Sequence, residues 1–143
     1  LDGCAGTGAV GIEALSRGAS YVLFIERDHR SVSLIRRNVR RCGLADRCTI
    51  RRARLPGALK ASSENPFDLV FLDPPYGAKD IGTILTAAVR HLSPRGLLVF
   101  ERQLDKSPLV DPGLKSVRVL RAGSSVLELY IPIAPNETAD QME

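Results

Sequence analysis

Two apolar patterns alternate along the chain. Short runs rich in β-branched, aromatic and aliphatic residues predict strands at residues 21–25, 67–72 and 97–101, all of them buried or nearly so. Between residues 81 and 92, apolar residues recur at helical spacing: Ile81, Ile84, Leu85, Ala88, Val89 and Leu92. Strands that alternate with helices predict an α/β fold with a mostly parallel sheet and right-handed crossovers.

The remaining elements complete this prediction. A helix from about residue 10 to residue 15 precedes Gly18, the expected residue after its end. Asp28 is the expected cap of a second helix, whose apolar stripe is Val32, Ile35, Val39 and Cys42. A short strand is expected at residues 48–52. Two strands at 117–120 and 126–131 flank a glycine-containing turn, which predicts an antiparallel hairpin at the end of the fold.

The chain of 143 residues is long enough for one domain with its own core, expected at residues 1–131. Residues 132–143 combine prolines and acidic residues with little apolar pattern, and predict a disordered tail. The chain starts at Leu1-Asp2, where Leu1 resembles the last residue of a strand, so a fragment or a trimmed chain is expected.

Charge and cysteine content narrow the class of protein. The net charge is +4, and arginines cluster at 36–37, 40–41, 47 and 51–54, which fits either a polyanionic partner such as RNA or DNA or solvated helix faces. No apolar run approaches the ~20 residues of a membrane span. Three cysteines without C-x-x-C spacing and two histidines predict neither a metal site nor disulfides, and favour a cytoplasmic protein.

Asp73-Pro74-Pro75-Tyr76 follows directly after the predicted strand 67–72. Pro75 restricts Pro74 to an extended backbone, and neither proline has an N–H group. The Asp73 carboxylate and the following carbonyls therefore form a rigid row of acceptors beside an aromatic ring. Such a row suits a planar ligand with an amino group, although a strand that ends in a Pro-Pro stop is an equal alternative on these residues alone.

A glycine-rich loop lies near the other end of the chain. Gly6, Gly8 and Gly11 form G-x-G-x-x-G at the start of a helix, where close backbone approach and unpaired N–H groups are expected. Glu26 closes the next strand and is expected to bind ribose hydroxyls. NAD, FAD and S-adenosylmethionine sites share this pattern. Asp2, at the end of the first strand, and the Asp73 row favour S-adenosylmethionine.

Residues 2–8, Glu26 and 73–76, in this order, resemble the class I S-adenosylmethionine-dependent amino-methyltransferases. Residues 5–19, 71–77 and 123–130 are similar to the bacterial 16S ribosomal RNA guanine-N2 methyltransferase family. The resemblance implies a seven-stranded Rossmann-like fold that lacks its basic N-terminal part here. It also implies methylation of a guanine amine in ribosomal RNA, within the small ribosomal subunit or its assembly intermediate.

The resemblance implies a set of site residues as well. The catalytic residues are Asp73, Pro74, Pro75 and Tyr76. The residues that bind the cofactor are Asp2, Ala5, Gly6, Thr7, Gly8, Glu26, Arg27 and Arg54.

Two positions depart from the family pattern. Cys4 stands where the family usually has Phe, and Arg54 stands where an acidic residue usually meets the adenine amine. A guanidinium has no acceptor and cannot replace that carboxylate. A DNA adenine-N6 methyltransferase, a non-catalytic RNA-binding module of the same fold and a nicotinamide oxidoreductase remain alternatives, although the last leaves residues 73–76 without a role.

Overall fold

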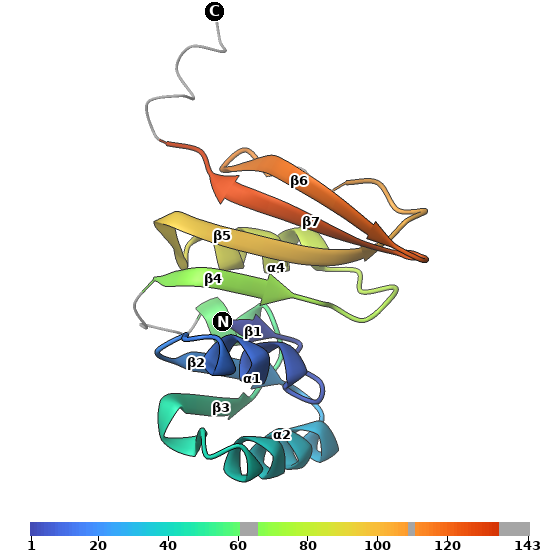
Figure 1. Cartoon of the computed structure of the whole chain (residues 1–143). Helices are drawn as coiled ribbons and strands as arrows, with labels where there is room; N and C mark the ends of the chain where they lie inside the picture. The colour runs from blue at the N-terminus through green and yellow to red at the C-terminus, as the bar shows by residue number, and fades with distance from the viewer. Residues whose placement is uncertain (61–65, 109–110, 135–143) are drawn as a thin grey trace, which may run out of the picture.

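A computed structural model of the chain describes residues 1–60, 66–108 and 111–134. The elements are β1 (Asp2–Gly3), α1 (Ala9–Ser16), β2 (Val22–Glu26), α2 (His29–Arg41), the 3-10 turn η1 (Ala45–Arg47), β3 (Cys48–Arg52), α3 (Gly57–Lys60), β4 (Phe67–Leu72), α4 (Ile81–Val89), β5 (Leu92–Gln103), β6 (Leu114–Ala122) and β7 (Ser125–Pro132). Within the described ranges, seven strands form one sheet in the order β3-β2-β1-β4-β5-β7-β6 (Figure 1).

The sheet is parallel from β3 to β5, and β7 pairs antiparallel with both β5 and β6. The α/β fold class and the antiparallel hairpin expected from the sequence are therefore confirmed. Strand order reverses at β1, because the chain first builds β2 and β3 on one side and then β4 and β5 on the other. Ligands of open α/β sheets bind at such a reversal, outside the carboxyl ends of the strands.

Helices cover both faces of the sheet, and β2 contributes to both cores. Val22 and Phe24 pack with Leu15 of α1 and Ile35 of α2 on one face. The alternate residues of β2 point to the other face and join the cluster formed with α3 and α4. Figure 1 shows α1 and α2 on one side of the sheet and α4 on the other. Because β2 is enclosed on both faces, its apolar run is continuous.

Strand β4 differs from the prediction that it is buried throughout. Val70 and Leu72 are fully buried against the α4 side, whereas Leu69 is 43% exposed on the opposite face. Among the described residues, those beside the exposed part of β4 line a hollow of about 700 Å³. The apolar run of β4 therefore has one face packed against the core and one face partly exposed in this hollow.

The helix ends follow the capping prediction, with one exception. The Asp28 side chain accepts a hydrogen bond of 2.8 Å from the Ser31 N–H, which confirms it as the cap of α2. Gly18 has a left-handed φ of 109° after α1, as expected of its position. The prediction that Cys42 lies in the core is wrong. α2 ends at Arg41, so the apolar stripe ends one turn earlier and Cys42 is exposed.

The C-terminal part of the sheet is longer than predicted. β5 runs from Leu92 to Gln103, whereas the sequence predicted a strand only at residues 97–101 and placed Leu92 in the preceding helix, which ends at Val89. Gly123 supplies the left-handed turn between β6 and β7. β7 continues to Pro132, the first residue of the expected tail, and residues 135–143 of that tail lie outside the described residues.

Gly11 and Gly82 provide a matched test of the helix packing. A Cβ at Gly11 would lie 2.3 Å from Cε1 of the buried Phe24, so Gly11→Ala is expected to lower the free energy of unfolding by about 1–3 kcal/mol. Gly82, in α4, has open space at the same point, and Gly82→Ala is expected to raise stability by up to about 1 kcal/mol. Urea denaturation of both variants measures the difference. Equal effects would contradict the described contact between α1 and β2.

Candidate active site and cofactor cavity

A cavity of about 740 Å³ lies at the carboxyl ends of the parallel strands. We call it the strand-end cavity. Its lining combines loops that follow four strands with part of α4: Cys4, Ile25, Glu26, Arg27, Asp28, Ala53, Arg54, Leu55, Asp73, Pro74, Pro75, Tyr76, Gly77, Ala78, Asp80, Ile84 and Glu101. The volume is in the range of small-molecule and cofactor sites.

The glycine-rich loop borders this cavity in a tightly turned conformation. Gly6 and Gly8 have φ values of 56° and 79°, in the left-handed region that glycine adopts without strain. Cys4 has a φ of 60°, the one positive value among the described non-glycine residues. Such a backbone costs about 1–2 kcal/mol in a residue with a Cβ. The strain therefore lies at the cavity wall, where local strain is often part of a site.

The Cys4 thiol is a neutral group at this wall. Burial, together with the charges of the nearby Glu26 and Asp73 carboxylates, raises the pKa of Cys4 to about 11. Because the thiolate is the nucleophilic form of cysteine, Cys4 is unreactive near neutral pH.

The chain itself already occupies several N–H groups that the sequence suggested would be free. Glu26 Oε2 accepts from the Gly6 N–H at 2.9 Å, and the Thr7 hydroxyl accepts from Ala9 at 3.3 Å. Asp2 Oδ2 accepts from the Gly11 N–H at 3.0 Å. The expectation of an open helix N-terminus is therefore wrong for these groups. Side-chain acceptors hold the glycine loop in place instead.

Glu26 connects this loop to the strand-end cavity. Its second carboxylate oxygen accepts from the Asp28 N–H at 2.9 Å, so both oxygens are oriented by backbone donors. An ionised carboxylate accepts about four hydrogen bonds, and two are used here. Glu26 keeps acceptor capacity for hydroxyl groups of a ligand in the cavity that it lines.

The loop after β4 presents acceptors to the same cavity. Within the described residues, no hydrogen bond engages the Asp73 carboxylate or the Pro74 carbonyl, whereas the Pro75 carbonyl accepts from the Ala78 N–H at 3.1 Å. The Tyr76 side chain beside them is 64% exposed. Two acceptors and an aromatic ring therefore remain available to a ligand.

The Asp73 carboxyl group is electrostatically perturbed. Desolvation raises its pKa above the ordinary range, and the charge of Glu101 raises it further. Both causes make a donor on a ligand more favourable here, because a donor would compensate the lost water and the carboxylate repulsion.

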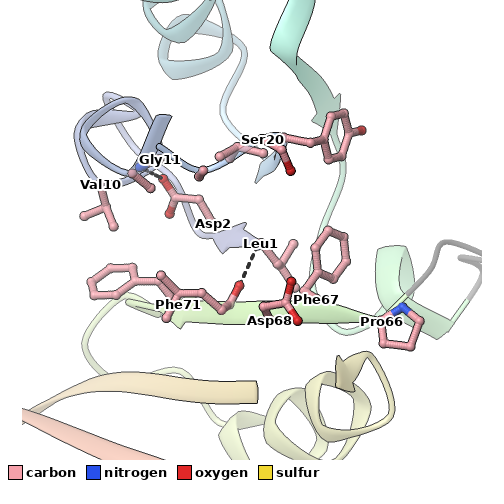
Figure 2. A pocket seen from close by; sticks show the side chains of 14 residues that line it. Leu1, Asp2, Val10, Gly11, Ser20, Pro66, Phe67, Asp68 and Phe71 are labelled. Atoms are coloured by element: carbon pink, nitrogen blue, oxygen red, sulfur yellow. Dashed lines mark hydrogen bonds between the residues drawn. The ribbon is translucent and has the colours of Figure 1, made fainter. Parts of the chain in front are cut away.

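Asp2 does not line the strand-end cavity. It lies in a separate hollow of about 700 Å³ between α1 and β4, where its carboxylate faces the start of α1 (Figure 2). In the same view, the Leu1 amino group donates a 2.8 Å hydrogen bond to the Leu69 carbonyl, which fixes β1 against β4. Burial raises the pKa of Asp2 to about 7, although the Gly11 N–H opposes this shift.

The other residues expected at the site divide into two groups. Arg27 and Arg54 line the strand-end cavity, together with Glu26 and residues 73–76. Ala5, Gly6, Thr7 and Gly8 form the loop beside it but do not contribute to its described lining. The sequence reasoning missed Leu55, Ile84 and Glu101. Glu101 carried a usable signal, since it ends a predicted strand just as Glu26 does.

The composition of the lining fits a nucleoside-containing cofactor. Glu26 supplies acceptors for a ribose diol, and Ile25, Ala53, Leu55 and Ile84 supply an apolar wall for a flat heteroaromatic ring. Arg54 also belongs to this lining, so the departure from the family pattern noted in the sequence lies at the cavity itself. Among the residues that the structure describes, no group of three His, Cys, Asp or Glu side chains could hold a metal ion.

The strand order, the glycine loop and the acidic end of β2 together define the fold of the class I S-adenosylmethionine-dependent methyltransferases. The sequence profile of the family described as "Conserved hypothetical protein 95" matches residues 1–131. The chain belongs to this family. The resemblance to the ribosomal RNA small subunit methyltransferases D is confirmed by the same match and by the curated relatives.

Ribosomal RNA small subunit methyltransferase D of Haemophilus influenzae is 34% identical over 116 residues, which cover 78% of this chain and 60% of the relative. A solved structure of a candidate methylase from the same organism superposes with a TM-score of 0.83 at 28% identity and covers 94% of this chain and 86% of that one. A conserved hypothetical protein of Streptococcus pyogenes gives a TM-score of 0.82 at 27% identity, with coverages of 93% and 88%. The chain spans 39–60% of the length of the curated relatives that it matches.

The helices within the described ranges were also compared with the length and hydropathy of membrane spans. None of them is long and apolar enough to cross a bilayer.

The buried Asp2 carboxylate predicts a specific pH dependence of stability. The pKa of Asp2 is about 7 in the folded protein, above the ordinary 3.8. Between pH 3.8 and 7, Asp2 is therefore protonated in the folded protein and ionised in the unfolded chain. Stability therefore falls as the pH rises from 3.8 to 7. Asp2→Asn keeps an acceptor for the Gly11 N–H and removes the charge, so the variant is expected to gain stability relative to the wild type by a few kcal/mol over this range, at about 1.4 kcal/mol per pKa unit. Urea denaturation at several pH values measures the difference, and parallel pH profiles would contradict it.

Proposed function

We propose that this protein transfers a methyl group from S-adenosylmethionine to the exocyclic N2 amine of a guanine in small-subunit ribosomal RNA. One observation carries the proposal: the Asp73 carboxylate and the Pro74 carbonyl are unengaged within the described residues, and they line a cofactor-sized cavity beside the exposed ring of Tyr76. Family membership and the name of the Haemophilus influenzae relative support ribosomal RNA as the substrate.

The cofactor would occupy the strand-end cavity. Glu26 would accept hydrogen bonds from the ribose hydroxyls, and Leu55 and Ile84 would pack against the adenine ring. Ala5 to Gly8 would border the methionine part, while Arg27 would lie beside the ribose. S-adenosylmethionine supplies an electrophilic methyl group on a positively charged sulfur, and the carboxylates around this cavity complement that charge.

The acceptor row acts on the substrate amine. An aromatic amine is a poor nucleophile because its lone pair is delocalised into the ring. Asp73 and the Pro74 carbonyl would accept the two N–H groups, which favours a pyramidal nitrogen with a localised lone pair. Positioning then supplies most of the rate, and no histidine or cysteine base is required.

Tyr76 would hold the base that carries this amine. A base inside a helix cannot reach the acceptor row, so it must be extruded. Stacking of an extruded base on an aromatic side chain contributes about 1–3 kcal/mol. The 64% exposure of Tyr76 leaves its ring accessible for this contact.

The charge of helix α2 supports the proposal that the protein binds a polyanion. Arg30, Arg36, Arg37, Arg40 and Arg41 are all exposed on it, and the helix contains no acidic residue. The last two interact favourably with the helix C-terminus. However, the pairs Arg36–Arg40 and Arg37–Arg41 are like charges four residues apart, each destabilising by about 0.2–0.5 kcal/mol. Binding of RNA phosphates would offset this repulsion.

The proposal includes a cytoplasmic location, where ribosomal subunits and their assembly intermediates are found. Methylation of adenine in DNA is less well supported, because the curated relatives are named for ribosomal RNA. A purely structural RNA-binding module would not need the unengaged acceptors beside a cofactor-sized cavity.

Removal of the Asp73 acceptor tests the catalytic assignment. In the natural gene product, Asp73→Ala is expected to lower kcat for methyl transfer by about 10²–10³-fold, the effect of removing one positioned polar contact from a reacting group. Labelled S-adenosylmethionine with assembled small subunits, naked ribosomal RNA or duplex DNA measures it. Asp68→Asn is the control, because Asp68 lies at the opposite end of β4 and bonds Ser93. Unchanged transfer by Asp73→Ala would overturn the assignment.

A charge-matched pair of triple variants tests the RNA-binding face. Arg37, Arg40 and Arg41 are changed together to Gln, and the control changes the exposed Lys115, Arg118 and Arg121 of β6, at the other edge of the sheet. The α2 variant is expected to raise KM for RNA by at least about tenfold at low salt, with less effect at high salt and with kcat retained. Equal effects of the two variants would attribute the change to net charge alone.

A further inference from the structure

Glu101 lies beside the acceptor row although it belongs to another strand. Leu72, the last residue of β4, pairs with Phe100 of β5, so Asp73 directly after β4 and Glu101 within β5 are the next residues along two neighbouring parallel segments. Strands in a sheet are about 4.8 Å apart. The contribution of Glu101 to the raised pKa of Asp73 is consistent with this separation.

Glu101 also contributes to the lining of two cavities. It lines the strand-end cavity and a smaller cavity of about 380 Å³, which we call the flanking cavity. The flanking cavity shares residues 74–78 with the strand-end cavity and is lined as well by Phe100, Gln103 and Lys106. Tyr76 belongs to both linings. A base stacked on Tyr76 would therefore have one edge at Asp73 and Glu101 together.

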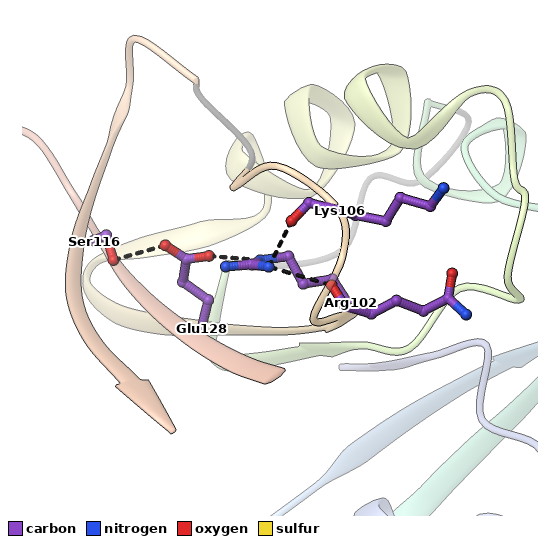
Figure 3. Close-up of polar contacts among 5 residues, drawn as sticks. Arg102, Lys106, Ser116 and Glu128 are labelled. Carbon is purple, nitrogen blue, oxygen red and sulfur yellow. Dashed lines mark hydrogen bonds and ion pairs between the residues drawn. The ribbon is translucent and has the colours of Figure 1, made fainter. Parts of the chain in front are cut away.

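The Glu101 carboxylate has no hydrogen bond or ion pair within the described part of the chain, although it is half-buried. Its neighbour Arg102 does not neutralise it. Arg102 Nε donates to Glu128 at 3.0 Å, and its guanidinium also donates to the Lys106 carbonyl at 2.8 Å (Figure 3). Two carboxylates side by side repel each other, and Asp73 is in addition partly desolvated. A ligand with several donors would relieve both costs.

Guanine has this donor pattern on one edge. Its N1–H and its N2 amino group are adjacent donors on the Watson–Crick edge, which enzymes that extrude a base commonly read. Adenine has an amino group there too, but its N1 is an acceptor. A carboxylate facing N1 therefore favours guanine and repels adenine, because an ionised carboxylate only accepts hydrogen bonds.

We propose that Glu101 is a specificity-determining residue, whose carboxylate accepts the N1–H of the target guanine while Asp73 and Pro74 hold the N2 amine. The proposal rests on the proposed methyl transfer and adds the group that separates a guanine from other amino-bearing bases. It gives the two neighbouring carboxylates different partners on one base.

A base analogue isolates this contact. 2-Aminopurine keeps the 2-amino group but has no hydrogen on N1. Two small-subunit RNAs are compared, one with guanine and one with 2-aminopurine at the position that the wild-type gene product methylates. The variants are Glu101→Ala and Glu101→Gln, with Glu13→Gln as control, since Glu13 lies on the exposed face of α1 and pairs with Arg17. Thermal unfolding and titration with S-adenosylmethionine verify that each variant is folded and binds the cofactor.

The wild type and the control are expected to prefer guanine by about ten- to a hundredfold in kcat/KM, the range of a hydrogen bond to a charged group. Glu101→Ala is expected to lose that factor on the guanine RNA and to keep or raise its rate on the 2-aminopurine RNA, because the repulsion of the bare N1 is removed. Glu101→Gln is expected to bring the two rates close together, because its amide donates to the bare N1. It also removes the charge beside Asp73, which lowers the pKa of Asp73, so the loss of activity in acid moves to lower pH.

Equal losses on both RNAs in Glu101→Ala would overturn the proposal, because Glu101 would then act on the cofactor or the fold rather than on N1. Unchanged rates on both RNAs would overturn it as well. The failure of the proposed function is distinguishable from these results. In that case the wild type would methylate neither RNA, or Asp73→Ala would retain full activity on the guanine RNA.

Discussion

The rest of the structure depends on the pairing of the two-residue strand β1 between β2 and β4. This pairing reverses the strand order at the centre of the sheet and directs the chain segments after β1, β2 and β4 to one edge. The hydrogen bond that the Leu1 nitrogen donates to the Leu69 carbonyl holds β1 to β4, and the one that the Gly11 N–H donates to the Asp2 carboxylate holds β1 to α1. Glu26 and Asp73, distant in sequence, line one cavity as a result.

The acceptors near this edge of the sheet form two groups: some bind backbone N–H groups of the protein, and the others remain available to a ligand. Asp2 and Glu26 use their oxygens to orient the glycine loop, and their partners are backbone N–H groups. Asp73, the Pro74 carbonyl and Glu101 have no such partner within the described residues. The proposed chemistry uses the second group, because acceptors that the fold leaves unsatisfied are the ones that a donor-rich base can stabilise.

Charge is unevenly distributed over the molecule. Carboxylates outnumber Arg27 and Arg54 in the lining of the strand-end cavity, whereas α2 carries exposed arginines and no acidic residue. The buried pair of Arg102 and Glu128 lies between β5 and β7 and fixes the loop that contains Lys106. Arg102 is thus bound to Glu128 and to the Lys106 carbonyl rather than to Glu101, although Arg102 and Glu101 adjoin in sequence.

The sequence by itself determined the elements and their order, because helical and strand periodicity, the Asp28 cap and the turn glycines are local properties. It also determined the acceptor row, since Pro74 and Pro75 restrict their own backbone. Only the tertiary structure decided which side chains meet. Asp2 faces α1 rather than the strand-end cavity because its carboxylate accepts from the Gly11 N–H. Cys42 is exposed because α2 ends before it, and Glu101 adjoins Asp73 because β5 pairs with β4. Such contacts depend on pairing between distant segments, which no local pattern encodes.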